Sequence, residues 1–279
     1  MKALLTTATA LALLVGVPLA AQASPQQDLK EFREYYMKKF PGVSLQEFAN
    51  GVYAIDPVSR VTWEALEEDF PPYEDDLKKG EKLFKTPFKN GKTYASCFPN
   101  GGVGIAQNYP YFDAANNTVK TLEQEINECR VKNGEEPLKA YTGDAAFITA
   151  YMAYTSRGKK VNVVVPNDPN ALAWYERGKR HFYMKRGQLN LSCANCHKDS
   201  AGHYIRAEML SPALGHTTHF PVYRQTWGNM GTLHRRYQGC NEQVRAKGFG
   251  SQSDEYRALE YFHTYMSNGI EMNGPGSRK

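Results

Sequence analysis

Two cysteines and a histidine stand close together in the second half of the chain. Cys193, Cys196 and His197 form a Cys-x-x-Cys-His motif. Two thiols at this spacing reach the two vinyl groups of one porphyrin, while the imidazole of the following residue lies under the iron. A redox dithiol would not require the adjacent histidine, and a zinc site would require two further ligands at usable spacing. The motif therefore predicts one covalently attached haem c, held by Cys193 and Cys196, with His197 as the proximal iron ligand.

A third cysteine, Cys240, stands among basic residues. Arg235 and Arg236 precede it, and Arg245 follows it. Positive charge near a thiol favours the thiolate, lowers the thiol pKa and attracts anionic sulfur compounds. Cys240 is therefore a candidate reactive sulfur. The alternatives are a buried structural cysteine and a disulfide to another chain.

Methionine is the ordinary distal ligand of c-type cytochromes, and several methionines follow the motif. Met209 and Met230 stand at distances from His197 along the chain that allow ligation. Most methionines at such places belong to the core or the surface. We keep Met230 as the alternative to Cys240 for the distal position.

The chain contains an internal repeat. Residues 80–84 match residues 178–182, and residues 154–158 match residues 265–269. Each copy has the pattern of an amphipathic helix, a loop ending at a cysteine, an irregular segment and a second helix. This is the plan of a small cytochrome c domain, so the sequence predicts a mainly α protein with two tandem cytochrome c-like domains.

The repeat also relates the cysteines of the two copies. Cys129 and Cys240 each lie 25 residues before a matching tyrosine, and Cys97 corresponds to Cys193. Residues 98–101 contain neither a second thiol nor a histidine, so we expect no haem in the first copy. If Cys240 reaches the iron in the second copy, Cys97 and Cys129 should approach one another in the first. A disulfide between them is predicted, the alternative being two separate buried thiols.

The expected organisation has four parts. A basic n-region, an apolar stretch and a terminal small-x-small pattern indicate that residues 1–23 are a signal peptide, cleaved on export to the periplasm. Residues 24–75 form an N-terminal extension, expected to pack on or around the first copy. Residues 76–162 are assigned to a haem-less cytochrome c-like domain, and residues 163–279 to a haem-binding one.

Composition excludes some classes of partner. The chain has 34 basic and 29 acidic residues, and its small net charge of +5 is scattered along the sequence. This excess does not indicate nucleic acid binding, although it is compatible with small anions or an acidic protein partner. After the signal peptide no segment approaches the roughly 20 apolar residues of a membrane span. We therefore expect neither nucleic acid nor membrane as a partner.

The haem motif and the segment from Arg236 to Cys240 together resemble the SoxA family. This family provides the c-type cytochrome subunit of SoxAX, known as L-cysteine S-thiosulfotransferase. The resemblance implies two tandem cytochrome c-like domains, with a haem in the second ligated by a histidine and by a cysteine that carries a persulfide. Cys240 is then the distal ligand and the catalytic residue, and Arg236 binds substrate. The missing motif after Cys97 is similar to the single-haem form of the family.

The resemblance also implies a reaction and its partners. In this family thiosulfate is joined oxidatively to a cysteine of the SoxYZ sulfur-carrier protein, and electrons pass to cytochrome c. The implied haem partner is SoxX, in a heterodimer with this chain. Two other functions fit the motif alone: a periplasmic electron-transfer cytochrome without sulfur-transfer chemistry, and a haem-based sensor with an open distal position.

Overall fold

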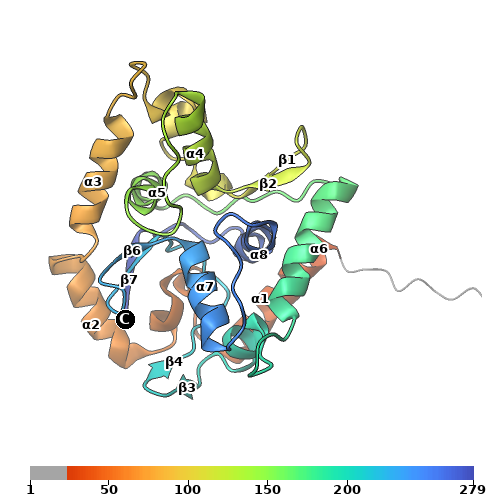
Figure 1. The fold of residues 1–279 in the computed structure, drawn as a ribbon. Coiled ribbons are helices and arrows are strands. Elements are labelled where there is room, and N and C mark those ends of the chain that lie inside the picture. The colour runs from red at the N-terminus through yellow and green to blue at the C-terminus, as the bar shows by residue number, and fades with distance from the viewer. Residues whose placement is uncertain (1–23) are drawn as a thin grey trace, which may run out of the picture.

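The computed structural model describes residues 24–279, and the predicted signal peptide lies outside the described residues. Helices predominate and the strands are short, which confirms the prediction of a mainly α fold (Figure 1). The helices are α1 (Pro25–Lys39), α2 (Pro57–Asp69), α3 (Glu74–Lys85), α4 (Leu122–Lys132), α5 (Asp144–Tyr154), α6 (Pro169–Tyr183), α7 (Leu233–Gln243) and α8 (Asp254–Tyr265). Across residues 24–279, no helix has both the length and the apolar character that crossing a bilayer requires.

Each copy of the repeat is built on a crossing of two helices. α3 packs against α5 in the first copy, and α6 packs against α8 in the second. Gly80 and Gly178 lie at these crossings. A Cβ atom at Gly80 would lie 1.9 Å from the carbonyl oxygen of Phe147, and one at Gly178 would lie 2.0 Å from that of Ala258. Glycine is required at both positions because the helix backbones approach so closely.

A β-hairpin and a short helix stand between the crossing helices of each copy. The first copy has β1 (Tyr111–Asp113), β2 (Thr118–Lys120) and α4. The second has β5 (Val222–Arg224), β6 (Asn229–Gly231) and α7. Each of these second-copy elements begins and ends 111 residues after its counterpart. The match therefore extends through a region where the two sequences share few residues.

Two further pairings occur only in the second copy. β7 (Gly276–Arg278), at the C-terminus, pairs in parallel with β5 and makes a three-stranded sheet. A small hairpin of β3 (Tyr204–Ile205) and β4 (Glu208–Met209) follows the haem motif. Both additions lie near the part of the fold that carries the candidate ligands.

The two copies are related by an approximate two-fold axis. Residues 158–161 pair antiparallel with residues 269–272 through backbone hydrogen bonds of 2.8–2.9 Å. Lys160 and Glu271, which are equivalent in the repeat, face each other in this pairing. A segment that pairs antiparallel with its own counterpart places the two-fold axis between them.

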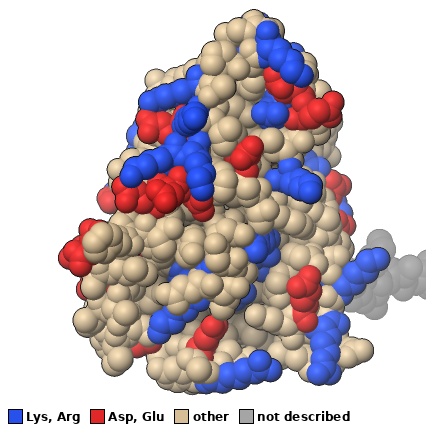
Figure 2. Space-filling model, turned by 60° about the vertical axis from the view of Figure 1, so that its left-hand side comes forward, with Lys and Arg blue, Asp and Glu red and all other residues tan. Residues whose placement is uncertain are grey.

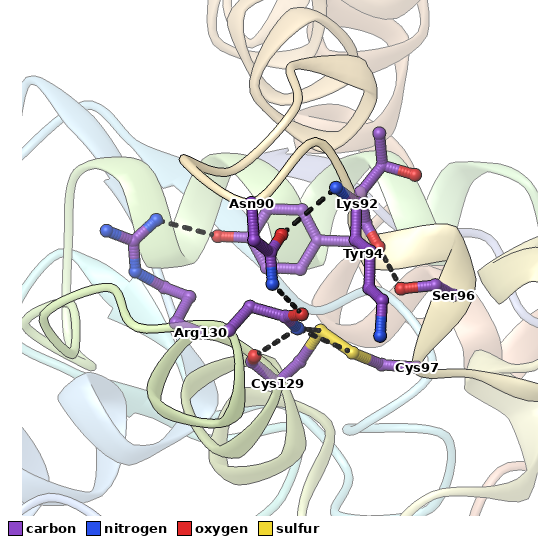
Figure 3. Close-up of a disulfide and its surroundings, with 9 residues drawn as sticks. Asn90, Lys92, Tyr94, Ser96, Cys97, Cys129 and Arg130 are labelled. Atoms are coloured by element: carbon purple, nitrogen blue, oxygen red, sulfur yellow. Dashed lines mark hydrogen bonds between the residues drawn. A yellow bond between two sulfur atoms is a disulfide. The ribbon is translucent and has the colours of Figure 1, made fainter.

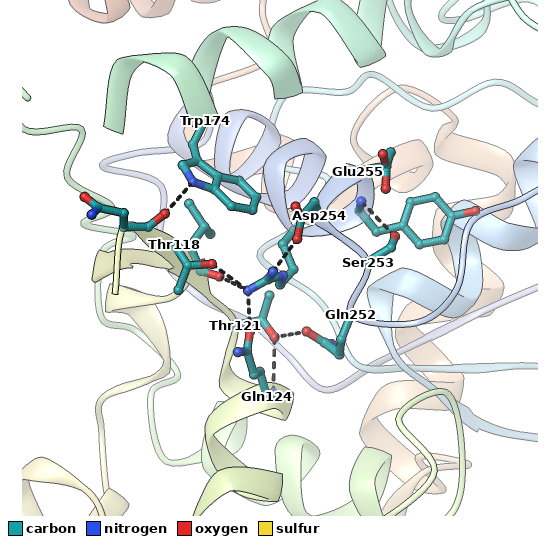
Figure 4. Close-up of polar contacts among 12 residues, drawn as sticks. Thr118, Thr121, Gln124, Trp174, Gln252, Ser253, Asp254 and Glu255 are labelled. Carbon is teal, nitrogen blue, oxygen red and sulfur yellow. Dashed lines mark hydrogen bonds and ion pairs between the residues drawn. The ribbon is translucent and has the colours of Figure 1, made fainter. Parts of the chain in front are cut away.

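Polar side chains also join the copies. Arg257 of α8 donates hydrogen bonds to the Thr118 hydroxyl and the Gln124 side chain, at 2.9 Å each. The Thr121 hydroxyl, at the start of α4, lies 2.6 Å from the side-chain oxygen of Gln252. Figure 4 shows these residues, which come from β2, α4 and the approach to α8, converging on one interface. The copies therefore form one continuous body.

The first helix of the N-terminal extension, α1, packs on the second copy, although we expected the extension to pack on or around the first; Tyr73, near its end, does contact α5 of the first copy. On α1, the Phe32 ring lies 6.0 Å from the ring of Phe182 on α6. Asp28 accepts a 2.8 Å hydrogen bond from the Tyr175 hydroxyl. The Tyr36 hydroxyl donates a 2.6 Å hydrogen bond to the backbone oxygen of His197. The aromatic stripe of α1 thus covers α6 and braces the loop that carries the haem motif.

Cys97 and Cys129 are joined by a disulfide, as predicted (Figure 3). The bond closes a loop with a sequence separation of 32 residues. The Asn133 side chain donates a 2.8 Å hydrogen bond to the Cys129 carbonyl and lies 3.5 Å from the sulfur of Cys97. Nearby, Arg130 donates a 3.0 Å hydrogen bond to the Tyr94 hydroxyl. The disulfide therefore fastens α4 to the loop before it, in the place where the second copy has its haem motif.

Candidate active site

One cavity in the second copy brings the candidate ligands together. Cys193, Cys196, His197 and Cys240 all line it, as does Arg236. Its remaining wall is mainly apolar and includes Phe182, Leu191, Leu210, Phe220, Leu233 and Leu259. A large apolar cavity with a few polar groups at its edge is the usual form of a cofactor site.

The haem motif is held by short-range hydrogen bonds. The Asn195 side-chain oxygen accepts a bond from the Ser192 backbone at 3.1 Å, and the Ser192 hydroxyl accepts one from the Asn195 backbone at 3.1 Å. These reciprocal bonds close the loop before a single π-helical turn, Asn195–Asp199, that carries Cys196 and His197. The turn fixes the direction in which the histidine leaves the backbone.

The imidazole of His197 is oriented through one nitrogen. Its Nδ1 lies 3.0 Å from the backbone oxygen of Ser211, so Nδ1 carries the proton and donates. The second nitrogen, Nε2, is left as the basic atom. Metal-bound histidines are commonly held in this way, with the outer N–H on a carbonyl group. The arrangement suits His197 for an iron ligand.

Arg236 and Cys240 are four residues apart on α7, which places them one turn apart on the same face of the helix. Burial opposes ionisation of Cys240, but the positive charge of Arg236 and contact with His197 outweigh it, and the thiol pKa falls to about 7. Burial instead raises the pKa of Cys193 to about 12, and it also raises the pKa of Cys196. Among the three free thiols, Cys240 is therefore the one suited to act as a thiolate.

The alternative distal ligands are placed elsewhere or already engaged. Met230 is fully buried in a small cluster with Tyr73, Ala146 and Ala150, outside the cavity. Met209, on β4, does not line the cavity either. His263 lines it, but both of its ring nitrogens have partners, the Tyr237 hydroxyl at 3.1 Å and a backbone oxygen at 3.2 Å. Of Met209, Met230, His263 and Cys240, Cys240 is the one that shares the cavity with His197 and has an uncommitted ligand atom.

The expectation that three neighbouring arginines act on Cys240 is wrong for two of them. Arg235 lies over the Trp227 ring, with its guanidinium carbon 4.2 Å from the ring centre, and Arg245 is exposed. Arg224, which sequence reasoning missed, instead contributes to the lowered pKa of Cys240. It precedes Cys240 by 16 residues on a different element, so no local spacing indicated it.

The cavity residues fit a covalently bound haem c. Two unpaired thiols three residues apart, an oriented histidine beside them and a third thiol share one apolar space. The buried apolar wall would leave polar ligands of a hydrated metal ion without partners, whereas a porphyrin presents mainly carbon to it. Across residues 24–279, no cluster of three or more His, Cys, Asp or Glu side chains is arranged to hold a bare metal ion.

Comparisons with known proteins identify the family. Residues 79–161, in the first copy, match the family model of the SoxA/TsdA cytochrome c domain. Over 258 residues the chain is 54% identical to the L-cysteine S-thiosulfotransferase subunit SoxA of Allochromatium vinosum, covering 92% of this chain and 91% of that one. The chain belongs to the SoxA family. SoxA of Chlorobaculum tepidum is 55% identical over 92% of this chain and 89% of its own length.

A solved structure agrees with this assignment. The crystal structure of SoxXA from P. pantotrophus matches with a TM-score of 0.71 and 31% sequence identity, covering 78% of this chain and 84% of that one. Membership of a SoxA cytochrome c family implies haem c as the cofactor, in agreement with the residues that line the cavity. The SoxA family model matches the copy that lacks a haem motif, so the cytochrome c fold persists there without its attachment residues.

Proposed function

We propose that this SoxA chain joins thiosulfate oxidatively to a cysteine of a SoxYZ carrier protein. L-cysteine S-thiosulfotransferase activity follows from its close relatives. The observation that carries the proposal is the cavity itself, where Cys240 and Arg236 stand on one face of α7 beside the haem motif. A plain electron carrier would need neither an acidic thiol nor a cation one turn away from it.

The proposal assigns one haem c per chain. Cys193 and Cys196 would hold it, with His197 and Cys240 as its two iron ligands. When bound, the haem supplies an acceptor for one electron at a time. The haem-less domain would comprise residues 76–162 and the haem-binding domain residues 163–279. The disulfide in the first copy supports a single haem, since both of its cysteines are committed to each other.

The chain's own residues bind and orient the sulfur substrate. The guanidinium of Arg236 would hold the sulfonate oxygens in bidentate fashion, which directs the outer sulfur toward Cys240. The apolar wall keeps water from the reacting sulfurs. In the net reaction a new sulfur–sulfur bond joins thiosulfate to the carrier's cysteine, with release of one proton from the thiol and two electrons to the cytochrome acceptor. The catalytic role of Cys240 would be to carry the thiosulfate: its thiolate bonds to the outer sulfur as the two electrons leave, and the carrier's thiolate then attacks that sulfur and releases the Cys240 thiolate.

The partners follow from the same reaction. SoxX, a small cytochrome, would form a heterodimer with this chain and accept the electrons. The match to the crystal structure of SoxXA supports this partner. SoxYZ would present its cysteine at the mouth of the cavity. We place the protein in the periplasm because a disulfide and a covalent haem both belong to an oxidising compartment reached by export.

Turnover with defined partners tests the function. Holoprotein with SoxX, thiosulfate, SoxYZ and oxidised cytochrome c should reduce the cytochrome and add one thiosulfonate group to SoxYZ, observed by intact mass. A pyridine haemochrome assay on the isolated chain should give one haem per polypeptide. Cytochrome reduction without mass change on SoxYZ would replace the proposal by electron transfer alone. Two haems per chain would overturn the assignment of the first copy.

A further inference from the structure

Two arginines near Cys240 have no acidic partner. Arg224 ends β5 and Arg236 lies on α7, and both are half-buried. Over residues 24–279, neither guanidinium forms an ion pair with a carboxylate or donates a hydrogen bond, and the Nε of Arg224 is fully buried without a partner. The Arg224 guanidinium carbon lies 5.5 Å from the centre of the Trp227 ring. Burying an unpaired cation is costly, so its retention requires a reason.

The charges of Arg224 and Arg236 act on the same thiol, although only Arg236 lines the cavity itself. Burial, followed by the charge of Arg236, lowers the pKa of Arg224 to about 10. Both arginines also act on the thiol of Cys240. Figure 2 shows Lys and Arg atoms set in a hollow in the middle of one face of the molecule. Two positive charges without an ion-pair partner therefore act on the reactive thiol, although Glu208 partly offsets that of Arg224 and the two arginines come from elements separated in the sequence.

The first copy of the repeat provides an internal comparison. The residues equivalent to Arg224 and Arg236, 111 positions earlier, are Asp113 and Glu125. Both have partners in their own copy. Asp113 lies 3.4 Å from the amino group of Lys120, and Glu125 accepts hydrogen bonds from two tyrosine hydroxyls. The same two positions thus carry satisfied carboxylates where there is no reactive cysteine, and unsatisfied cations where there is one.

In the described part of the chain, neighbouring arginines have hydrogen-bond partners, which Arg224 and Arg236 do not. Arg235 is hydrogen-bonded to the Asn229 side chain and lies on Trp227. Arg278 is the register partner of Arg224 on β7, but it donates a 2.6 Å hydrogen bond to the Ser277 backbone and lies 5.1 Å from the Tyr53 ring centre. Within residues 24–279, Arg224 and Arg236 are the arginines that act on the Cys240 thiol, and neither guanidinium has a hydrogen-bond or ion-pair partner.

We propose that Arg224 is a second substrate-binding residue, which together with Arg236 forms a receptor for a doubly charged sulfur oxyanion beside Cys240. This inference rests on the proposed function and narrows its substrate class. Two fixed guanidinium charges match a dianion such as thiosulfate, and each presents N–H donors to separate oxygens. A monoanion such as thiocyanate is neutralised by one guanidinium group, so the second adds little to its binding free energy. Arg224 is thereby a specificity-determining residue.

Binding without turnover tests the receptor. The dissociation constants of thiosulfate and of thiocyanate are measured by calorimetry on the haem-loaded SoxA–SoxX complex, with no carrier protein or electron acceptor present. Arg224→Gln should weaken thiosulfate binding about tenfold or more, the scale of a charge-assisted hydrogen bond. Thiocyanate binding should change much less. Arg235→Gln, which removes the same charge from an arginine that already has a partner, should leave both constants within about twofold.

Two companion variants separate the outcomes. Arg224→Met keeps the packing of the side-chain stem and serves if Arg224→Gln does not yield haem-loaded protein. The inference would be overturned if the Arg224 variant that folds bound thiosulfate as tightly as the Arg235→Gln control does. An equal loss for thiosulfate and thiocyanate would also overturn it, since no preference for a dianion would remain. Arg236→Gln tests the proposed function separately: if it alone weakens thiosulfate binding, the function stands and the role of Arg224 falls.

Discussion

Glu123 and His234 occupy the same position in the two copies of the repeat, and they meet at the interface between those copies. Each is the second residue of its helix, α4 or α7. Both are buried, and the His234 Nε2 lies 3.0 Å from a carboxylate oxygen of Glu260 on α8. The Nδ1 of His234 accepts a 3.1 Å hydrogen bond from the Gln252 backbone, so Nε2 carries the proton, although it makes no hydrogen bond to Glu260.

This acidic cluster should make stability depend on pH. Burial raises the pKa of Glu260 to about 8, and burial together with the Glu260 charge raises that of Glu123 to about 7. Between pH 4.5 and 8 the folded protein therefore keeps protons that the unfolded chain has lost, and the free energy of unfolding falls as pH rises. Burial lowers the pKa of His234 to about 4, which causes a separate loss of stability as pH falls below about 6.5.

Glu260→Gln removes the loss of stability that the Glu260 carboxyl causes as pH rises. We subtract the unfolding temperature of the wild type from that of the variant at each pH. This difference should be greater at pH 8 than at pH 5 by about 2–4 °C or more. Calorimetry at the two pH values measures this difference. Glu81→Gln, on an exposed residue paired with Lys85, is the matched control. A wild-type-to-variant difference that is the same at both pH values would contradict the prediction.

Cys240→Ala should remove both a ligand and a reactive sulfur. The ferric haem spectrum should change, and thiosulfate-dependent turnover with SoxYZ should be lost. Met230→Leu is the control, because Met230 lies in a separate buried cluster and its replacement conserves volume. Absorption and spin-resonance spectra of the two variants distinguish the ligands. An unchanged spectrum in Cys240→Ala would refute the distal-ligand role, and a changed one in Met230→Leu would restore the alternative.

Arg236→Lys keeps the positive charge but loses the planar guanidinium group, whose two parallel N–H donors can bind two oxygens at once. We expect turnover with thiosulfate and carrier to fall more than tenfold, which corresponds to about 1.4 kcal/mol or more in the barrier. Haem content should be unaffected, since Arg236 is not proposed as a ligand. Steady-state kinetics and a haemochrome assay on the same preparation measure the two quantities. Turnover within twofold of wild type would show that charge alone suffices at this position.

Replacing Cys97 and Cys129 together by serine tests the disulfide of the first copy. Closing a loop of this length stabilises a protein by about 3–4 kcal/mol in the chain-entropy model, so the variant should lose stability of that order. Denaturant unfolding measures the loss. The haem spectrum should be retained, because the bond lies in the other copy. A stability within 1 kcal/mol of wild type would indicate that packing around Tyr94 and α4 already fixes this loop.

The sequence revealed what depends on spacing along the chain. The Cys-x-x-Cys-His motif, the one-turn separation of Arg236 and Cys240, and the helices at Asp144–Tyr154 and Asp254–Tyr265 are all local patterns. The disulfide was predictable although its cysteines are distant, because the repeat supplied a second copy for comparison. Periodicity and internal symmetry are properties that a single sequence displays directly.

Other features depend on contacts between distant segments and left no local signal. The docking of α1 against α6 depends on which aromatic surface is left uncovered in the folded second copy. Arg224 reaches the site because β5 places it beside α7. The backbone oxygen of Ser211 accepts a hydrogen bond from His197 because the chain folds back beside that histidine after the haem motif. Met230 was a reasonable ligand by spacing, but it packs against Tyr73 of the N-terminal extension.

The two-fold relation between the copies is what the fusion of two identical subunits would produce. Lys160 and Glu271 face each other as equivalent residues, which is the geometry of an isologous interface between two identical subunits. A gene duplication that fused two such subunits would have preserved their association while freeing each half to change. One half could then exchange its haem motif for a disulfide, and its arginines for carboxylates, while the other kept the reactive centre. The asymmetric enzyme retains the architecture of a symmetric dimer.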